Sequence, residues 1–314
     1  MKKILVIFCL SLMLFATGCG GDNKDTKDVA TEADNMEITV AVMPSIDKIP
    51  IIVGESMGFF EKRGLTVNVE NFQSPTDRNA ALQGGKVDAV MSDMVADVLY
   101  LQAGLDMKIT SLIQTDFAII ANGESGIKTF EDITPSHTNG IALNCLMEYI
   151  ADKAGDSQKI MVPDVMTRIE QVLSGDIDLA VVPEPYGSMA VERGAVKVGT
   201  AADLDIYAAV MLFPTEFIKE NPKAVKAFYE GYNDAVKYLD KNGMANVMED
   251  VTAKGEFPQS TQKALGKLKF VPLQAPSQAQ FDDIQGWMTK HPEFKGPYNY
   301  KFEDVTDFSF LTQK

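Results

Sequence analysis

Short apolar runs alternate with helix-like segments along most of the chain. The runs "EITVAVMP" (37–44) and "LTVNVENF" (65–72) have the apolar and β-branched character of strands. Six further runs predict strands at 87–91, 107–113, 117–122, 140–144, 159–162 and 178–182. Because helix-like segments separate most of these runs, the pattern predicts an α/β fold with mostly parallel strands and helices on both faces.

The segments between the runs carry residues typical of helix ends. Ser74 precedes a proline, so it can cap a helix whose first position the proline occupies, and Asp93 precedes another helix. Gly64 suits the end of a helix that begins near Pro50. Further helices are expected after Asn144, after Pro163-Asp164 and after Pro183. Beyond the apolar run 206–214 the pattern predicts helices at 215–220, 222–242, 244–255, 258–267 and 277–290.

A weak internal repeat relates two parts of the chain. "GKVDAVMSD" (85–93) and "GDIDLAVVP" (175–183) align without gaps at an offset of 90 residues. Each begins with glycine, has aspartate at its fourth position and enters an apolar strand. Any joint between a helix and a strand can look like this. Two copies, each followed by a helix start, predict two similar α/β lobes.

The N-terminus has the pattern of an export signal. Residues 1–18 combine Lys2 and Lys3 with an apolar run of a dozen residues, which is too short to span a membrane. Ala16-Thr17-Gly18-Cys19 resembles a bacterial lipobox, in which Cys19 is lipidated and becomes the new N-terminus. An ordinary signal with a chance cysteine is the alternative. Residues 19–36 are rich in charge and poor in apolar residues, which predicts a flexible tether.

Composition excludes several classes of function. The 314 residues are 46% hydrophobic with a formal net charge of −15, so the chain can bury a core but is a poor partner for nucleic acid. Once Cys9 is cleaved away and Cys19 is lipidated, only Cys145 remains in the folded part. One cysteine and two scattered histidines predict no disulfide, metal site or cofactor. The sequence lacks Gly-x-Ser-x-Gly, a Gly-rich phosphate loop and His-Glu-x-x-His, so no catalytic centre is expected.

Polar residues follow the carboxyl ends of the predicted strands, where ligands bind in open α/β sheets. In the first lobe these candidates are Ser45, Asp47, Ser74, Asp77, Asp93, Met94 and Thr115. In the second lobe they are Asn144, Glu148, Glu184 and Tyr186. Each has a simpler alternative. Helix capping explains Ser74, Asp93 and Asn144 as well. Glu184 can complement a helix dipole, and Asp47 can be a solvated loop residue.

Several longer segments resemble a known family. "MGFFEKRGLTVNVENF", "DRNAALQGGKVDAVMSDMVA", "IKTFEDI" and "LSGDIDLAVVPEPYGSMA" occur in this order behind the tether. Over residues 37–290 the chain resembles the solute-binding lipoproteins of bacterial ABC importers. The branch it resembles contains the thiamine-pyrimidine, sulfonate and nitrate binding proteins.

The resemblance implies two α/β lobes joined by two hinge strands, which close on a ligand. Lobe one would comprise residues 37–121 and 213–314, and lobe two residues 122–212, with mixed and mostly parallel sheets. The strand-end residues named above would contact the ligand, and Tyr207 near the return hinge could stack on a ring. The implied partners are a membrane permease and a lipid bilayer that anchors the protein outside the cytoplasm, on the cytoplasmic membrane or in the periplasm.

The nature of the ligand does not follow from the resemblance. These loops carry mainly acids, with Arg78 and Lys48 as the nearby cations. That balance favours a neutral or cationic organic solute, such as a pyrimidine-like or vitamin-like heteroaromatic molecule. Backbone N–H groups alone can still hold an anion. An enzyme on the same fold, of the pyrimidine-precursor synthase or dehydratase type, is the alternative, and an extracytoplasmic sensor domain is a third possibility.

Overall fold

The computed structural model describes residues 36–311, which lie within one compact unit of the chain. The export signal, Cys19 and the tether up to residue 35 fall outside the described residues. Among the described helices, none has both the length and the apolar character that a membrane crossing requires.

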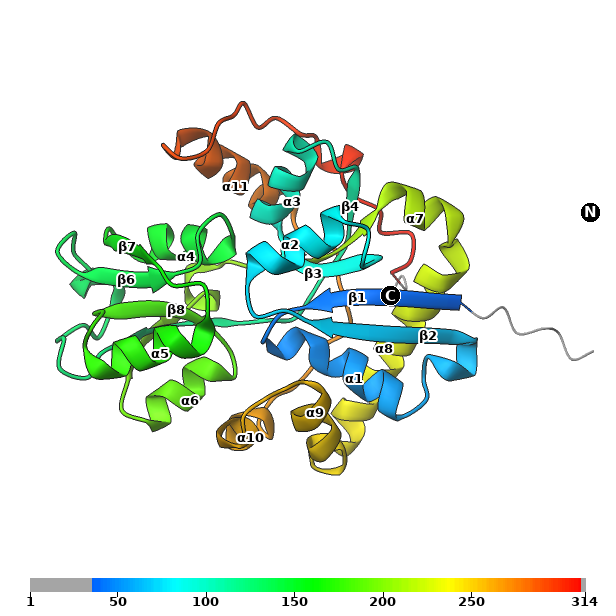
Figure 1. Cartoon of the computed structure of the whole chain (residues 1–314), viewed down its shortest axis with the longest axis horizontal. Coiled ribbons are helices and arrows are strands. Elements are labelled where there is room, and N and C mark those ends of the chain that lie inside the picture. Colours follow the sequence, from blue (N-terminus) through cyan, green and yellow to red (C-terminus); the bar gives the residue numbers. More distant parts are fainter. Residues whose placement is uncertain (1–35, 312–314) are drawn as a thin grey trace, which may run out of the picture. The chain divides into compact units, whose positions relative to one another are not determined.

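The first sheet has five strands in the order β2-β1-β3-β10-β4 (Figure 1). Its strands are β1 (Met36–Val42), β2 (Leu65–Asn71), β3 (Ala89–Asp93), β4 (Met107–Leu112) and β10 (Ala209–Pro214). Strand β1 pairs in parallel with both β2 and β3, while β10 runs antiparallel to β3 and β4. The sheet is therefore mixed but mostly parallel, as the pattern predicts.

The second sheet repeats this plan in the order β7-β6-β8-β5-β9. Its strands are β5 (Phe117–Ala121), β6 (Thr138–Ile141), β7 (Gln158–Met161), β8 (Leu179–Pro183) and β9 (Val196–Thr200). Here β5 is the antiparallel strand, between β8 and β9. Strand β9 was not predicted, because "VKVGT" is short and contains a glycine.

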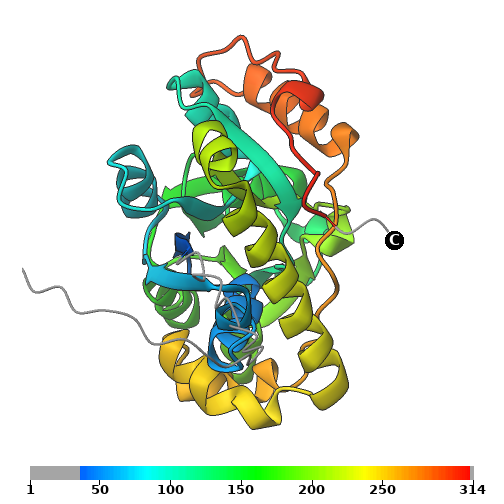
Figure 2. The ribbon, with the colours of Figure 1, turned by 90° about the vertical axis from the view of Figure 1, so that its right-hand side faces the viewer.

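Helices cover both faces of each sheet (Figure 1). On the first sheet, α1 and α8 pack on one face and α2 and α3 on the other. On the second sheet, α4 lies on one face and α5 and α6 on the other. Figure 2 shows α8 as the long helix beside α1. The bounds are α1 Ile49–Ser56, α2 Pro75–Gln83, α3 Met94–Gln102, α4 Leu146–Ala154, α5 Val165–Ser174, α6 Tyr186–Glu192, α7 Thr215–Glu220, α8 Pro222–Asn242, α9 Met248–Lys254, α10 Gln262–Leu265 and α11 Gln278–Lys290.

The helix starts are those that the capping residues predict, with one exception. The Ser74 hydroxyl accepts a hydrogen bond from the Asp77 backbone N–H at 3.2 Å, and the Asp93 carboxylate accepts one from the Ala96 N–H at 2.9 Å. The prediction that Asn144 caps α4 is wrong by one residue, because Cys145 is the N-cap. Asn144 instead has a positive φ of 57° and donates its backbone N–H to the Glu148 carboxylate at 2.8 Å.

The internal repeat has a structural meaning. Asp88 and Asp178 occupy equivalent positions, and each accepts a backbone N–H from the neighbouring parallel strand. Asp88 bonds to the Thr39 N–H at 2.8 Å, and Asp178 bonds to the Thr138 N–H at 2.7 Å. The repeated aspartates therefore tie β3 and β8 to β1 and β6 in the same way.

The chain passes between the sheets at other residues than expected. Strand β5 lies in the second sheet and β10 in the first, so the two crossings are residues 113–116 and 201–208. The boundary expected at 121–122 lies at the end of β5, and the boundary expected at 212–213 lies within β10. Antiparallel pairing of β5 with β8 and of β10 with β3 decides the difference, and such long-range pairing leaves no local signal in the sequence.

Candidate functional site

Loops at the carboxyl ends of strands from both sheets enclose a cavity of about 70 Å³, which we call the inter-sheet cavity. Because parallel strands end at the same edge of a sheet, polar loop residues from each sheet are gathered there. The lining residues that carry polar or charged side chains are Ser45, Asp47, Gln73, Arg78, Ser92, Asp93, Thr115, Cys145 and Arg168. Ser45 and Thr115 are hydrogen-bonded to each other at 2.7 Å, which joins the loop after β1 to a crossing segment.

Two buried arginines lie at equivalent positions in the two halves. Arg78 on α2 and Arg168 on α5 are 90 residues apart, the same offset as in the internal repeat, and are only 3% and 2% exposed. Each donates an Nη1 hydrogen bond to the backbone carbonyl of the residue 13 positions later. Arg78 bonds to the Met91 oxygen at 3.1 Å, and Arg168 to the Val181 oxygen at 2.7 Å. The duplicated α/β unit therefore delivers one guanidinium to each side of the cavity.

Two carboxyl groups line the cavity from the first sheet. Burial raises the pKa of Asp47 to about 7, although the neighbouring Lys48 and Arg78 oppose that shift. Burial also raises the pKa of Asp93, while Arg78 and backbone N–H groups at the starts of α3 and α4 lower it. Lys48 does not line the cavity. Its ammonium donates to Asn71 at 2.7 Å and lies 4.9 Å from the centre of the Phe257 ring.

Three residues that line the cavity carry buried polar atoms without a hydrogen-bond partner. These atoms are Asp47 Oδ1, Ser92 Oγ and Arg168 Nε. Buried polar groups in proteins are almost always hydrogen-bonded, and an unpaired one costs about 1–3 kcal/mol. These atoms are themselves almost inaccessible in this arrangement, so a polar molecule in the cavity would satisfy them only if it came within hydrogen-bond distance of them.

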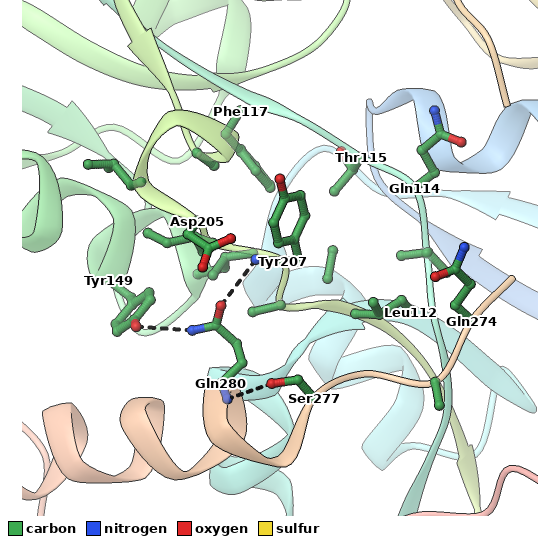
Figure 3. A pocket seen from close by; sticks show the side chains of 18 of the residues that line it. Leu112, Gln114, Thr115, Phe117, Tyr149, Asp205, Tyr207, Gln274, Ser277 and Gln280 are labelled. Carbon is green, nitrogen blue, oxygen red and sulfur yellow. Dashed lines mark hydrogen bonds between the residues drawn. The ribbon is translucent and has the colours of Figure 1, made fainter. Parts of the chain in front are cut away.

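A second and larger cavity, of about 800 Å³, lies along the two crossing segments, and we call it the hinge cavity (Figure 3). Tyr207 projects into it and is 54% exposed. Gln280 on α11 bridges its polar end, because its side chain accepts from the Tyr207 N–H at 3.2 Å and donates to the Tyr149 hydroxyl at 3.2 Å. The Tyr207 N–H, the Gln280 amide and the Tyr149 hydroxyl therefore all have partners within the protein.

A third cavity, of about 350 Å³, contains Thr115, Asp116 and Glu184 among its lining residues. Glu184 accepts the Ser188 N–H at 2.9 Å in the first turn of α6, and its other oxygen lies 3.7 Å from the Lys197 ammonium. The alternative role of Glu184, complementing a helix end, matches this geometry.

The structure brings together some of the residues predicted from the sequence and separates others. Ser45, Asp47, Asp93 and Thr115 line the inter-sheet cavity, Thr115 and Tyr207 line the hinge cavity, and Glu184 lines the third. The predicted residues that line none of the three are Ser74, Asp77, Met94, Asn144, Glu148 and Tyr186.

Three of the residues outside the cavities have clear contacts elsewhere. Met94 is fully buried at the start of α3. Glu148 lies 3.5 Å from the Lys159 ammonium and 3.4 Å from the His291 ring. Tyr186 is 3% exposed, its ring centre lies 6.3 Å from that of Phe257, and burial raises its pKa to about 12.

Arg168 is the site residue that sequence reasoning missed. Arg78 was noted as a nearby cation, and applying the 90-residue offset to it would have pointed to Arg168. The expectation that Arg78 and Lys48 are the only nearby cations is wrong, because α5 supplies a second buried guanidinium that lines the cavity.

The described residues around the inter-sheet cavity offer binding groups but no activated nucleophile. Cys145 is 3% exposed, and burial raises the pKa of its thiol to about 12, so it stays protonated at neutral pH. Neither histidine lines any of the three cavities.

Comparison with known proteins identifies the family. A family model described as "NMT1/THI5 like" matches residues 45–243, well over half of the chain. A curated relative is the nitrate import ATP-binding protein NrtC of Synechocystis, 25% identical over 247 residues. That match covers 66% of this chain and 35% of the relative, so the chain spans about a third of the relative's length.

Solved structures show the same fold. A ligand-binding component of an ABC-type import system from Staphylococcus aureus has a TM-score of 0.73 at 13% identity, with 88% of this chain and 97% of that chain covered. The alkanesulfonate-binding protein SsuA from Xanthomonas axonopodis has a TM-score of 0.66 at 13% identity, with 81% and 91% covered. With the match of the family model, these observations show that the chain belongs to the NMT1/THI5-like family.

Proposed function

We propose that this protein is the extracytoplasmic solute-binding component of an ABC importer. Its two halves would be lobes built on the first and second sheets, with residues 113–116 and 201–208 as the hinge. The lobes would capture a small organic solute and deliver it to a membrane permease. The family match and the fold of the neighbours support this proposal.

The proposal includes a lipid anchor at Cys19, which would hold the protein on the outer face of the cytoplasmic membrane or in the periplasm. It rests on the sequence pattern of residues 1–19 alone. The tether up to residue 35 would then give the binding lobes reach above the bilayer, since Met36 already belongs to β1.

One observation carries the binding function. The inter-sheet cavity is lined from both sheets, and it contains buried donors and an acceptor that have no partner in the protein. A solute that bonds to both sides would stabilise the closed arrangement over an open one, and this differential affinity is what drives closure.

The cavity volume bears on the size of the solute. About 70 Å³ is the share of roughly two water molecules in the liquid, whereas sites for drug-sized ligands span about 300–1,000 Å³. A vitamin-like heteroaromatic solute, as the sequence favoured, would need the lobes further apart. The hinge cavity, with Tyr207 beside it, is the alternative seat for such a ring.

A thermal-shift titration of the purified protein with a panel of small organic solutes tests the proposal. Each solute that raises the melting temperature would then be measured by calorimetry on Ser92→Ala and Ser56→Ala. Both serines have a buried hydroxyl without a partner, but only Ser92 lines the inter-sheet cavity. We expect Ser92→Ala to weaken binding about 2- to 10-fold through the loss of one hydrogen bond, and Ser56→Ala to leave it unchanged.

Equal affinity in both serine variants, together with a loss of binding in Tyr207→Ala, would move the site to the hinge cavity. The enzyme alternative is tested in the same samples. Mass spectrometry of the released solute should recover it unchanged, and conversion to a product would contradict a receptor.

A further inference from the structure

We infer that the solute is a compact zwitterion, with its anionic group bound by Arg168 and its protonated nitrogen facing Asp47. This inference rests on the proposed function and names the chemical class of the solute. It comes from how charge is distributed over the two walls of the inter-sheet cavity.

The wall formed by the second sheet presents a positive charge that no acid neutralises. Among the described residues no carboxylate oxygen lies within salt-bridge distance of Arg168, whose Nη1 is bonded to the Val181 carbonyl and to the Met147 sulfur. Burial lowers the pKa of Arg168, and Asp164 opposes that shift through its charge but forms no salt bridge with the guanidinium. Asp164 caps the start of α5, where it accepts the Thr167 N–H at 2.8 Å. A buried guanidinium that lacks a counter-charge is costly unless a ligand supplies one. Its unpartnered Nε is a donor suited to an oxyanion.

The wall formed by the first sheet has more acids than bases, and a cationic group on the solute would favour the charged form of Asp47, whose pKa is about 7. Asp47 and Asp93 both line the cavity there, against the single guanidinium of Arg78. Arg78 donates to Asn79 and to the Met91 carbonyl, and it forms no salt bridge with a carboxylate among the described residues. The Lys48 ammonium donates to Asn71, and Asp47 Oδ1 has no hydrogen-bond partner, although the charge of Lys48 and the backbone N–H groups of Asp47 and Lys48 lower the pKa of this carboxyl group. An ammonium or amidinium group on the solute would supply that donor together with a positive charge.

The two walls together exclude simpler solutes. A plain anion would satisfy Arg168 but would leave Asp47 without a donor, and a plain cation would do the reverse. A molecule that carries both charges would supply a partner to each wall. The cavity volume of about 70 Å³, the share of roughly two water molecules in the liquid, is smaller than a molecule with two charged groups, so even a compact zwitterion would bind with the lobes further apart than in this structure.

Matched pairs of small molecules test the inference by calorimetry on the wild-type protein. The pairs are 3-aminopropanoate with propanoate and 2-aminoethanesulfonate with ethanesulfonate. Each pair differs by one amino group, and the two pairs distinguish a carboxylate from a sulfonate. We expect the aminated member of at least one pair to bind 10-fold or more tightly than its partner, and ethylamine, which lacks the anion, to bind no better than the deaminated acids.

Two variants assign the effect to Asp47. Asp47→Asn should reduce the preference for the aminated member to about 2-fold or less. Asp97→Asn is the matched control, because Asp97 is also a buried carboxylate with unpartnered oxygens but does not line the inter-sheet cavity. It should keep the full preference.

Several outcomes would overturn the inference. Equal binding within both pairs, no binding by any of these probes, or an unchanged preference in a folded Asp47→Asn protein would each do so. If Asp47→Asn does not fold, the wild-type comparison still decides. A solute found by the broader screen to be a plain anion or a neutral ring would refute the zwitterion and leave the receptor function standing, whereas a protein that captures no solute would refute both.

Discussion

Replacing Arg168 with methionine separates binding from stability more sharply than any other single change. The side chain is 2% exposed, and burial lowers its pKa only to about 10, so it stays charged at neutral pH. Methionine has a similar length and no charge, and it fills irregular space well. The variant therefore removes the guanidinium without opening a large void.

The two effects of this change on the free energy of unfolding have opposite signs. Losing the 2.7 Å hydrogen bond to the Val181 carbonyl costs about 1.5–3 kcal/mol. Removing a buried charge that lacks a counter-ion returns a desolvation penalty of several kcal/mol. We therefore expect the unliganded variant to be as stable as the wild type within about 2 kcal/mol, or more stable. Binding has no such compensation, and losing a buried charge pair with the solute costs about 2–5 kcal/mol, or roughly 30-fold to several-thousand-fold in Kd.

Urea unfolding and calorimetry with the best solute from the screen measure the two quantities. Arg193→Met is the control, because Arg193 is an exposed arginine whose salt bridge with Glu170 lies at the surface. It should change both the stability and the affinity by less than about 1 kcal/mol. A variant of Arg168 that is destabilised by more than about 4 kcal/mol yet binds the solute normally would show that this arginine serves the fold and not the site.

Three further predictions concern the titration of the cavity and the packing of the fold. The pKa of Asp47 is about 7 in the folded protein, so the folded state binds this proton more tightly than the unfolded chain does. The stability that the bound proton contributes is therefore present at low pH and is lost as the pH rises from about 4 through 7. Urea unfolding between pH 4 and 8 should show the wild type losing up to about 4 kcal/mol relative to Asp47→Asn, and parallel curves would contradict this. Asp178→Ala removes the hydrogen bonds to the Thr138 N–H at 2.7 Å and to the Thr138 hydroxyl at 2.8 Å. It should lower the free energy of unfolding by about 1–3 kcal/mol. An unchanged urea midpoint would argue against this role of the repeated aspartate. Gly231→Ala places a methyl group 2.3 Å from the Phe60 ring and should lower the free energy of unfolding by about 1–3 kcal/mol. In Gly286→Ala the new methyl group meets no atom within 4 Å, so this variant should be neutral or mildly stabilising. The reverse order of melting temperatures would refute the packing argument.

The local chemistry of the chain predicted most of the elements. Ser74 and Asp93 cap the helices that they were expected to cap, and the apolar runs from 37 to 182 became strands within a few residues of the expected bounds. These features depend on hydrogen bonds and side-chain patterns within a few residues, which a single sequence displays. Strand β9 and the N-cap of α4 were missed because a short run with a glycine and a residue of positive φ give weak local signals.

The site was predicted in outline but not in its charges. Strand-end reasoning named Ser45, Asp47, Asp93 and Thr115, which line the inter-sheet cavity, because the carboxyl ends of parallel strands meet at one edge of a sheet. It could not find Arg168, which lies within a helix and reaches the cavity only because α5 packs against β8. Strand-end reasoning also could not show that Glu148 lies near Lys159 and His291. His291 is 143 residues further along the chain, so no local pattern connects the two.

The sequence by itself determined the two similar α/β units, because periodicity, caps and the 90-residue repeat are local properties of the chain. Only the tertiary structure decided which strands cross between the sheets and which charges face the cavity. Pairing of β5 with β8 and of β10 with β3 joins segments 60 to more than 100 residues apart, and burial sets the charge balance by removing water from two arginines and two acids. Both depend on contacts between distant residues, whose energies no short segment of the sequence contains.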